Sequence, residues 1–266
     1  MQQNARSYPP ALDYFVSSNS IVVSPFAYLT NEPPDLYRIW PGAGIYLNGH
    51  YYLFYSLIEV HGAWNFRSVG SGLGESSVAL GNYKRLQPQG NWQFPIEPSS
   101  VIEAGGWLYL YQAGKAHGKQ GTLLARVRPD KIEDPRAYEF YTGPGPQFSS
   151  QKDAESLLVE NTLGQVSVAW NPYLHKYVMA SSSDFYRPRQ IRFLVADAPY
   201  GPWSKPVASI QVPAQRQGKP VNLVYCTYLH PQLFRDNGQI MNLTYSLDLR
   251  NSGFDANCEM VEMRLK

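Results

Sequence analysis

The feature that most constrains this chain is a repeated pattern, in which a short turn is followed by a strand rich in aromatic and aliphatic residues. The pattern occurs four times, at intervals of about 55 to 70 residues. Its turns begin at Asn48, Gly105, Tyr173 and Asn237. A shorter apolar stretch precedes each turn, so every repeat opens with a β-hairpin, and glycine stands in three of the four turns. Repeats of this length, without long helical periodicity, predict the blades of a β-propeller.

Further predicted strands follow each hairpin. A third strand follows in all four repeats, and a fourth strand follows in the first three. The third strands are predicted at 66–72, 123–127, 191–196 and 259–265, and the fourth strands at 78–86, 137–142 and 203–212. The first strand of the last repeat is predicted at 229–234. Four antiparallel strands in a repeated unit are the anatomy of a propeller blade.

The predicted fold is therefore all-β, with one β-propeller domain over residues 1–266 built from four-stranded antiparallel blades. Residues 38–266 hold the four clear repeats. Residues 1–37 would form a reduced first blade and close the ring, through strands at 20–23 and 26–29 that complete the last blade. We expect five blades; a ring of four blades, or a chain that lacks its beginning, is the alternative.

Composition and charge argue against two classes of partner. The formal net charge is +2 with the signs mixed and no basic run, which argues against nucleic acid. No apolar stretch reaches the length of a transmembrane helix, so we expect no membrane insertion, and no signal peptide begins at Met1. Cys226 and Cys258 lie in predicted strands of the last repeat that could be neighbours. We expect a disulfide between them, as suits an exported protein, with two buried free thiols as the alternative.

Several short motifs stand in a fixed order over residues 36–265. They are Arg38-Ile39-Trp40-Pro41-Gly42-Ala43-Gly44, Leu123-Leu124-Ala125-Arg126-Val127, the stretch Val166 to Leu174, the stretch Ala196 to Pro206, and His230-Pro231 followed by Thr244-Tyr245-Ser246. Together they resemble the five-bladed propellers of the arabinanase and levansucrase-like glycosidases. The resemblance is closest to the branch called domain of unknown function 4185, which includes endo-D-arabinanases.

The resemblance implies a site at one end of the central channel and hydrolysis of a furanoside-rich, arabinan-like polysaccharide by a carboxylate pair. Two departures bear on this expectation. Asp13 is the only acid before Glu32, and Gln165 stands where relatives often have glutamate. Both departures favour the main alternative, a carbohydrate-binding propeller without catalysis. A third alternative is a propeller that serves as a protein-interaction platform.

Candidate catalytic residues are expected shortly before the innermost strands, because these strands converge at one end of a propeller. Asp35 and Glu155 occupy such positions and are the predicted catalytic carboxylates. A surface or loop role is the alternative for each of them, since acids are mostly exposed. Catalysis by such a pair requires no cofactor, and we expect a secreted, periplasmic or cell-surface monomer.

Five further residues are candidates for substrate binding. Arg38 and Trp40 alternate along one strand, where arginine can fix a hydroxyl or carboxylate and tryptophan can hold a sugar face; Trp40 could equally pack between blades. Gln165 and Ser167 share one strand face, with hydrogen bonding between blades as the alternative. His230 is assigned to the innermost strand of the last repeat, where the resemblance implies a histidine near the channel and a possible structural Ca²⁺. A histidine bonded to neighbouring blades is the alternative, because hard cations prefer several oxygen ligands.

Overall fold

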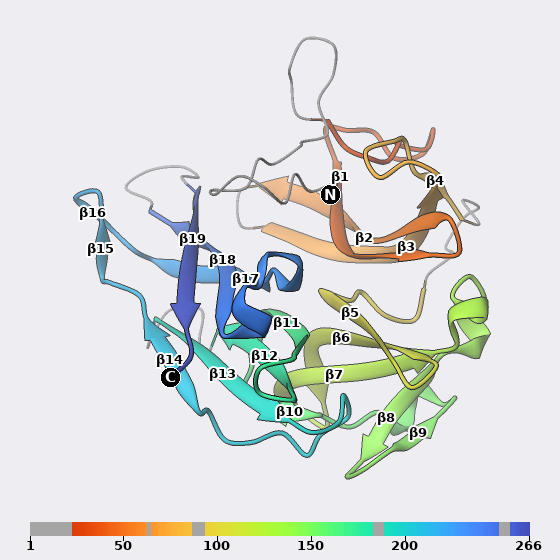
Figure 1. Cartoon of the computed structure of the whole chain (residues 1–266). Coiled ribbons are helices and arrows are strands. Elements are labelled where there is room, and N and C mark those ends of the chain that lie inside the picture. Colours follow the sequence, from red (N-terminus) through yellow and green to blue (C-terminus); the bar gives the residue numbers. More distant parts are fainter. Residues whose placement is uncertain (1–22, 63–64, 87–93, 183–188, 250–255) are drawn as a thin grey trace. The chain divides into compact units, whose positions relative to one another are not determined.

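The computed structural model describes residues 23–62, 65–86, 94–182, 189–249 and 256–266 (Figure 1). In this part of the chain the regular secondary structure is β-strand, interrupted by short 3₁₀ helices (η1–η5). The chain divides into two compact units, Met1–Glu97 and Pro98–Lys266, which we call unit 1 and unit 2. Each unit is described by itself below.

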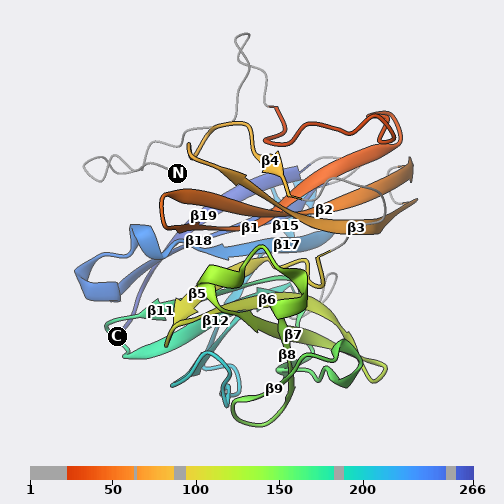
Figure 2. The same cartoon turned by 90° about the vertical axis from the view of Figure 1, so that its right-hand side faces the viewer.

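Unit 1 contains one antiparallel meander, sheet 1, whose first three strands lie next to one another in Figure 2. Its strands, in order, are β1 (Tyr37–Leu47), β2 (His50–Gly62), β3 (Asn65–Ser76) and β4 (Lys84–Arg85). Asn48 and Gly49 form the turn between β1 and β2 with φ of 49° and 90°, the positive values that a tight hairpin turn needs. The strand predicted at 78–86 is shorter than expected, because residues 78–81 form a turn before β4 begins.

The aromatic core of unit 1 explains where the segment before β1 lies. Phe26 packs against Tyr55 and Tyr83, with ring centroids 4.6 and 5.8 Å apart. Gly72 leaves room for Tyr55, since a Cβ at Gly72 would lie 2.1 Å from the Tyr55 Cζ. The backbone N–H of Tyr83 donates to the Pro25 carbonyl over 2.9 Å. The expectation that 26–29 is a strand completing the last blade is therefore wrong, because this segment belongs to unit 1; residues 20–22 lie outside the described residues.

Unit 2 contains three successive antiparallel sheets and a small hairpin (Figure 1). Sheet 2 comprises β5 (Ser100–Ala104), β6 (Trp107–Ala116), β7 (Lys119–Val127), β8 (Glu139–Gly143) and β9 (Gln147–Ser149), with β10 (Val159–Glu160) paired to β7. Sheet 3 comprises β11 (Leu163–Asn171), β12 (Lys176–Ser182), β13 (Gln190–Ala196) and β14 (Ala208–Gln211). Sheet 4 comprises β17 (Leu223–Leu229), β18 (Ile240–Asp248) and β19 (Ala256–Arg264), and β15 (Gln215–Arg216) pairs with β16 (Lys219–Pro220).

Both faces of sheet 3 are buried. Met179 and Leu194 belong to one apolar cluster with Tyr111 of sheet 2, and Ala180 belongs to a second cluster with Leu243 of sheet 4. Opposite faces of one strand therefore supply the two clusters, as alternation along β12 requires. This arrangement places sheet 3 between sheets 2 and 4 within unit 2.

Two predicted strands of unit 2 differ from the structure at prolines. The first strand of the last repeat is β17, which ends at Leu229, whereas it was expected at 229–234. Pro231 has no N–H to give to a ladder and instead starts the 3₁₀ helix η4 (Pro231–Leu233), with His230 directly before it. The fourth strand of the third repeat begins only at Ala208, since 201–206 hold two prolines and form no strand.

The expected disulfide is wrong, because both cysteines are free. Cys226 lies in β17 and Cys258 in β19, and these strands are not neighbours: β18 pairs with both. β17 and β19 are therefore two strand spacings apart, about 9.6 Å, whereas a disulfide needs Cα atoms within about 7 Å of each other. Burial, with the nearby Cys258 thiol, raises the pKa of Cys226 to about 11, so its thiol stays protonated at neutral pH.

Candidate functional site

The first strands of the three sheets in unit 2 are joined by side chains that bond to backbone groups. Between β5 and β11, the Ser99 Oγ donates to the Val166 carbonyl over 2.7 Å and accepts from the Val166 N–H over 3.0 Å. The Ser100 Oγ makes the same pair of bonds with Val168, at 3.3 and 2.9 Å. Each hydroxyl therefore satisfies both backbone groups of one residue on the edge of β11.

Gln165 and Ser167 make the corresponding link from β11 to β17. The Gln165 Oε1 accepts from the Cys226 N–H over 3.2 Å, and the Ser167 Oγ accepts from the Leu229 N–H over 3.0 Å. The two side chains therefore bond to the same neighbouring strand, β17. Their bonds are those of the alternative interpretation, hydrogen bonding between blades.

The strand register is irregular where β11 and β17 are linked. In β11 the register shifts between Leu163 and Val166, and in β17 it shifts between Tyr225 and Tyr228. Cys226, inside the second shift, has a φ of 51°, which is uncommon outside glycine. β-Bulges are over-represented next to active sites, where they redirect side chains. We therefore take the start of β11 and the adjoining part of β17 as the candidate site of unit 2.

His230 lies directly after β17, at the opposite end of that strand from Leu223. Its Nε2 lies 2.8 Å from the Thr244 Oγ1, and its Nδ1 lies 3.5 Å from the Gln232 Nε2. Burial lowers the pKa of His230, so the imidazole is neutral at neutral pH. Asn242, whose carbonyl accepts from the His230 N–H, is fully buried, and neither polar atom of its side chain has a hydrogen-bond partner among the described residues.

The residues around His230 do not fit the expected calcium ion. Both ring nitrogens already face side chains, and imidazole is a poor ligand for a hard cation. Among the described residues, no group of three or more His, Cys, Asp or Glu side chains could hold a metal. No step below depends on a metal.

Glu155 follows the short helix η3 (Lys152–Ala154), in the segment that leads from sheet 2 to β10. Its backbone N–H donates to the Lys152 carbonyl over 3.0 Å. Burial raises the pKa of its carboxyl to about 7, against a weaker lowering by the Lys152 charge. Within the described part of the chain Glu155 forms no ion pair, and the Lys152 charge offsets only part of the effect of burial on its charged form.

The remaining predicted site residues lie in unit 1. Asp35 is exposed in the turn before β1. The Arg38 side chain, in β1, donates to the Tyr37 carbonyl over 2.7 Å and to the Pro34 carbonyl. These two bonds stabilise the turn before β1. Trp40 is 45% exposed and meets the Phe66 ring edge-on, with centroids 5.2 Å apart. The structure thus groups Asp35, Arg38 and Trp40 in unit 1, and Gln165, Ser167 and His230 along β11 and β17 of unit 2.

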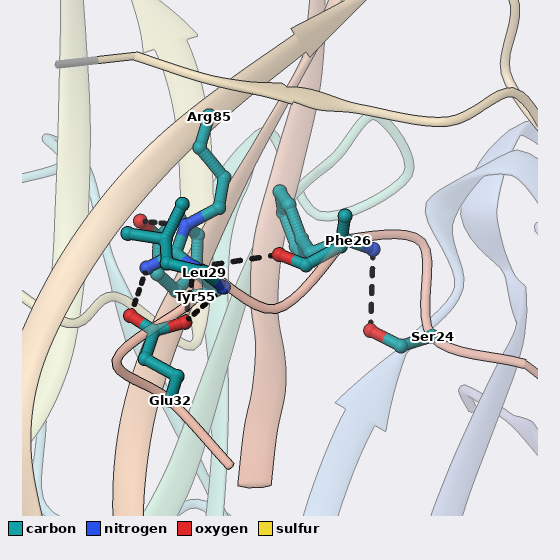
Figure 3. A network of polar contacts seen from close by, with 7 residues as sticks. Ser24, Phe26, Leu29, Glu32, Tyr55 and Arg85 are labelled. Atoms are coloured by element: carbon teal, nitrogen blue, oxygen red, sulfur yellow. Dashed lines mark hydrogen bonds and ion pairs between the residues drawn. The ribbon is translucent and has the colours of Figure 1, made fainter. Parts of the chain in front are cut away.

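A buried ion pair in unit 1 was missed by the sequence analysis (Figure 3). The Arg85 Nη1 and Nη2 donate to the two Glu32 carboxylate oxygens over 2.5 and 2.9 Å, and the Arg85 Nε donates to the Tyr55 hydroxyl over 2.8 Å. Burial acts to raise the pKa of Glu32, but the bonds from Arg85 and from the Leu29 N–H outweigh it and hold that pKa below 4.5. The partners are 53 residues apart, and no local motif links them.

Comparison with solved structures supports the fold. A protein of Bacteroides ovatus ATCC 8483 described as a candidate hydrolase has a TM-score of 0.58 at 20% identity; the alignment covers 80% of this chain and 54% of that one, so this chain spans about half its length. An alpha-L-arabinofuranosidase (CtGH43) of Clostridium thermocellum ATCC 27405 has a TM-score of 0.53 at 13% identity, with 88% and 72% covered. No curated protein matches the chain.

These similarities confirm the predicted all-β fold with a β-propeller arrangement of antiparallel sheets. Sheets 1 to 4 are the four blades that the described residues show, and a fifth blade stays a prediction. No described helix has both the length and the apolar character needed to cross a membrane. The family model for the Domain of unknown function (DUF4185) matches residues 22–248, most of the sequence, and the chain therefore belongs to this family.

Proposed function

We propose that this protein is a carbohydrate-active propeller that hydrolyses glycosidic bonds in a furanoside-rich, arabinan-like polysaccharide. The fold that it shares with an alpha-L-arabinofuranosidase supports this class of activity. The observation that carries the proposal is Glu155, a partly buried carboxyl whose pKa is raised and which has no ion-pair partner among the described residues. Such a polymer is met outside the cytoplasm, which agrees with the secreted or cell-surface location expected from the sequence.

Glu155 is suited to act as a general acid. A pKa of about 7 leaves close to half of its carboxyls protonated at neutral pH, whereas an unperturbed glutamate would be almost fully ionised. A protonated carboxyl can give its proton to the oxygen of the leaving sugar as the glycosidic bond breaks. The carboxylate left behind can then take a proton from water and return to its starting state.

Asp35 is proposed as the second carboxylate. Its carboxyl is exposed in the turn before β1, where a substrate could reach it. Glycosidases keep their two carboxyls about 5 Å apart for retention of configuration and about 6.5–9.5 Å apart for inversion.

A carbohydrate-binding propeller without catalysis is the second candidate, and Gln165 is the observation that favours it. Gln165 lies at the start of β11, and its side-chain oxygen accepts a hydrogen bond from the Cys226 N–H of β17. Relatives often carry a glutamate at the position of Gln165. An amide cannot donate or accept the proton that hydrolysis requires. The exposed Trp40 and Phe66 rings offer the apolar surface that a binding protein needs for a sugar face.

The deciding experiment incubates the purified full chain with arabinans, arabinogalactan, xylan and fructans, and measures released sugars by chromatography. Hydrolysis predicts release from a furanoside polymer, reduced at least about 100-fold by Glu155→Gln and by Asp35→Asn. Glu160→Gln is the matched control, because Glu160 is an exposed acid five residues from Glu155 that pairs with Lys119. No release, together with retention on one immobilised polymer, would establish the binding candidate instead.

A further inference from the structure

Two exposed aromatic rings lie on one face of sheet 1. Trp40 of β1 and Phe66 of β3 are 45% and 42% exposed, and their rings meet edge-on with centroids 5.2 Å apart. Ile39, the neighbour of Trp40 on β1, points to the other face and joins the buried cluster of Phe26 and Tyr55. We call the face that bears the two rings the tryptophan face, and its aromatic surface is open to solvent.

A serine stands beside each ring on the tryptophan face. Ser56 of β2 is directly opposite Trp40 of β1, so their Cβ atoms are about 5 Å apart. Ser68 lies two residues after Phe66 on β3, in a stretch that pairs regularly with β2, so these two side chains share a face. Ser68 is opposite Ile58, two residues after Ser56 on β2, and the two serines are therefore diagonal neighbours.

Glu97, the last residue of unit 1, joins the two serines. The Ser56 Oγ donates to the Glu97 Oε2 and the Ser68 Oγ donates to the Glu97 Oε1, each over 2.7 Å. Phe94, three residues earlier, is buried with its ring 6.1 Å from that of Phe54, which is two residues before Ser56 on β2. The chain before Glu97 is thus anchored on the tryptophan face, and one bond to each oxygen fixes the direction of the carboxylate.

The direction of these bonds determines what the cluster can bind. Because the Glu97 carboxylate accepts, both serine hydroxyls donate, and each serine oxygen can then act towards a ligand only as an acceptor. Ser68 is exposed, and Ser56 and Glu97 are half-buried, so a ligand can reach the cluster. The cluster therefore calls for a ligand with several hydrogen-bond donors along one edge, next to a surface that an aromatic ring can cover.

We propose that Trp40, Glu97, Ser56 and Ser68 form a binding subsite for a neutral sugar unit of the polysaccharide. This inference rests on the proposed function and specifies that the unit held by unit 1 carries no charge. A sugar offers hydroxyl donors at its edge and C–H groups on its face, which suit the acceptors and the Trp40 ring respectively. The Glu97 carboxylate would repel the carboxylate of a uronic acid.

A quaternary ammonium ion, such as choline, is the other ligand that suits aromatic rings beside a carboxylate. It has no hydrogen-bond donor for the oxygens of Ser56 and Ser68, whereas a sugar has several. The arrangement of the serines therefore favours the sugar, and choline serves as the competing probe in the test.

The test measures binding of a linear arabino-oligosaccharide to the full chain by calorimetry, in a Glu155→Gln background that the proposed function expects not to cleave it. Trp40→Ala should weaken binding at least about tenfold through the lost ring contact. Glu97→Gln should weaken it about tenfold, because a charge-assisted acceptor becomes neutral. Ser68→Ala, at an exposed position, should have a smaller effect in the same direction; thermal unfolding checks that each variant folds.

A methylated form of the same oligosaccharide tests the role of the donors. It keeps the sugar rings but has no hydroxyl to donate, so it should bind the unchanged protein about as weakly as the free oligosaccharide binds Glu97→Gln. Glu97→Gln should not weaken binding of the methylated form further. An equal loss of both forms in this variant would show that Glu97 does not accept from the sugar and would overturn its role.

Trp170→Ala is the matched control for the ring. Trp170 of β11 is 43% exposed and meets Tyr177 edge-on with centroids 5.0 Å apart, but the residue opposite it is Tyr177 rather than a serine bonded to a carboxylate. Glu103→Gln, at an exposed acid of β5, is the control for charge. Both controls should keep the full affinity; a loss as large as that of Trp40→Ala or Glu97→Gln would overturn the assignment.

The remaining outcomes separate this inference from the proposed function. Cleavage or binding of arabinan that neither Trp40→Ala nor Glu97→Gln alters would overturn the subsite and leave the proposed function standing. Choline binding that Glu97→Gln abolishes, with the oligosaccharide unaffected, would show a cation site and overturn the sugar assignment. Failure of the full chain to bind or cleave any of the polymers would overturn both proposals.

Discussion

Unit 1 buries an acid and an arginine as a pair, whereas unit 2 holds an acid and an arginine that are partly buried and not paired with each other. In unit 1, Glu32 and Arg85 neutralise each other through two hydrogen bonds (Figure 3). In unit 2, neither Glu155 nor Arg192 has an ion-pair partner among the described residues. Each partner of a buried ion pair offsets the cost of burying the other, whereas unpaired buried charges oppose folding and are typical of sites that handle protons or charged ligands.

The largest expected effect on stability comes from breaking the Glu32–Arg85 ion pair. Arg85→Met would leave the buried Glu32 carboxylate without its partner and should reduce the free energy of unfolding by about 3–5 kcal/mol. Urea denaturation measures this loss. Because the pKa of Glu32 is lowered on folding, the stabilisation is present above pH 4.5 and should be lost as the pH falls through the lowered value.

The double variant Glu32→Leu with Arg85→Met is the control for this prediction. Removing both charges leaves no unpaired ion, so the double variant should be more stable than Arg85→Met alone. A single variant as stable as the wild type would show that the ion pair does not hold unit 1 together, and the contrast between the units would fail.

The second prediction concerns Glu155, the acid of unit 2 without an ion-pair partner among the described residues. Because the pKa of Glu155 rises from 4.5 to about 7 on folding, the folded state binds more protons than the unfolded state between these values. Its ionisation therefore destabilises the protein as the pH rises through this window. Glu155→Gln should increase the free energy of unfolding by about 1–3 kcal/mol above pH 7 and change it little below pH 4.5. An equal effect at both ends of the range would contradict the raised pKa.

The third prediction tests the packing that positions the ion pair. A Cβ at Gly72 would lie 2.1 Å from the Tyr55 ring, which contacts Arg85. Gly72→Ala should therefore destabilise the protein by about 1–3 kcal/mol in chemical denaturation. Gly143→Ala is the control, because the nearest atom to its added Cβ is 3.5 Å away. Equal losses in both variants would indicate a general effect of removing glycine.

The smallest expected effect is at Arg192. Since no described carboxylate forms an ion pair with Arg192, Arg192→Met should change the free energy of unfolding by less than about 1 kcal/mol, in contrast to Arg85→Met. The comparison is made by denaturation in parallel, without added carboxylates. A loss as large as that of Arg85→Met would mean that Arg192 is structural and would remove the distinction between the two arginines.

The sequence was sufficient to predict the blade hairpins, because local signals define them. The turn at Asn48-Gly49 and the apolar strands beside it specify a hairpin without help from distant residues. The strands that were misplaced, at 229–234 and 203–212, contain prolines that stop a ladder. The disulfide was wrong for a topological reason: membership of one blade does not make two strands neighbours, and β18 separates Cys226 from Cys258.

The candidate site was predicted less well, because its contacts join distant parts of the chain. Strand alternation predicted a shared face for Gln165 and Ser167, but the register of β11 shifts between Leu163 and Val166, and their partners on β17 lie about 60 residues away. Arg192 gives no sequence signal at all. Its partly buried state, without an ion-pair partner among the described residues, arises only once β12 and β13 pair and Ser181 stands opposite it.

The serine bonds between β5 and β11 have a consequence for solubility. The first strand of each sheet is an edge, and an uncovered edge is a template for pairing with a strand of another molecule. At Val166 and Val168 the outward N–H and C=O groups are already taken by Ser99 and Ser100. Hydroxyl groups, rather than a further strand, occupy these backbone groups, so sheets 2 and 3 pack side by side without forming one continuous sheet. This stretch of β11 therefore cannot pair edge to edge with a strand of another molecule.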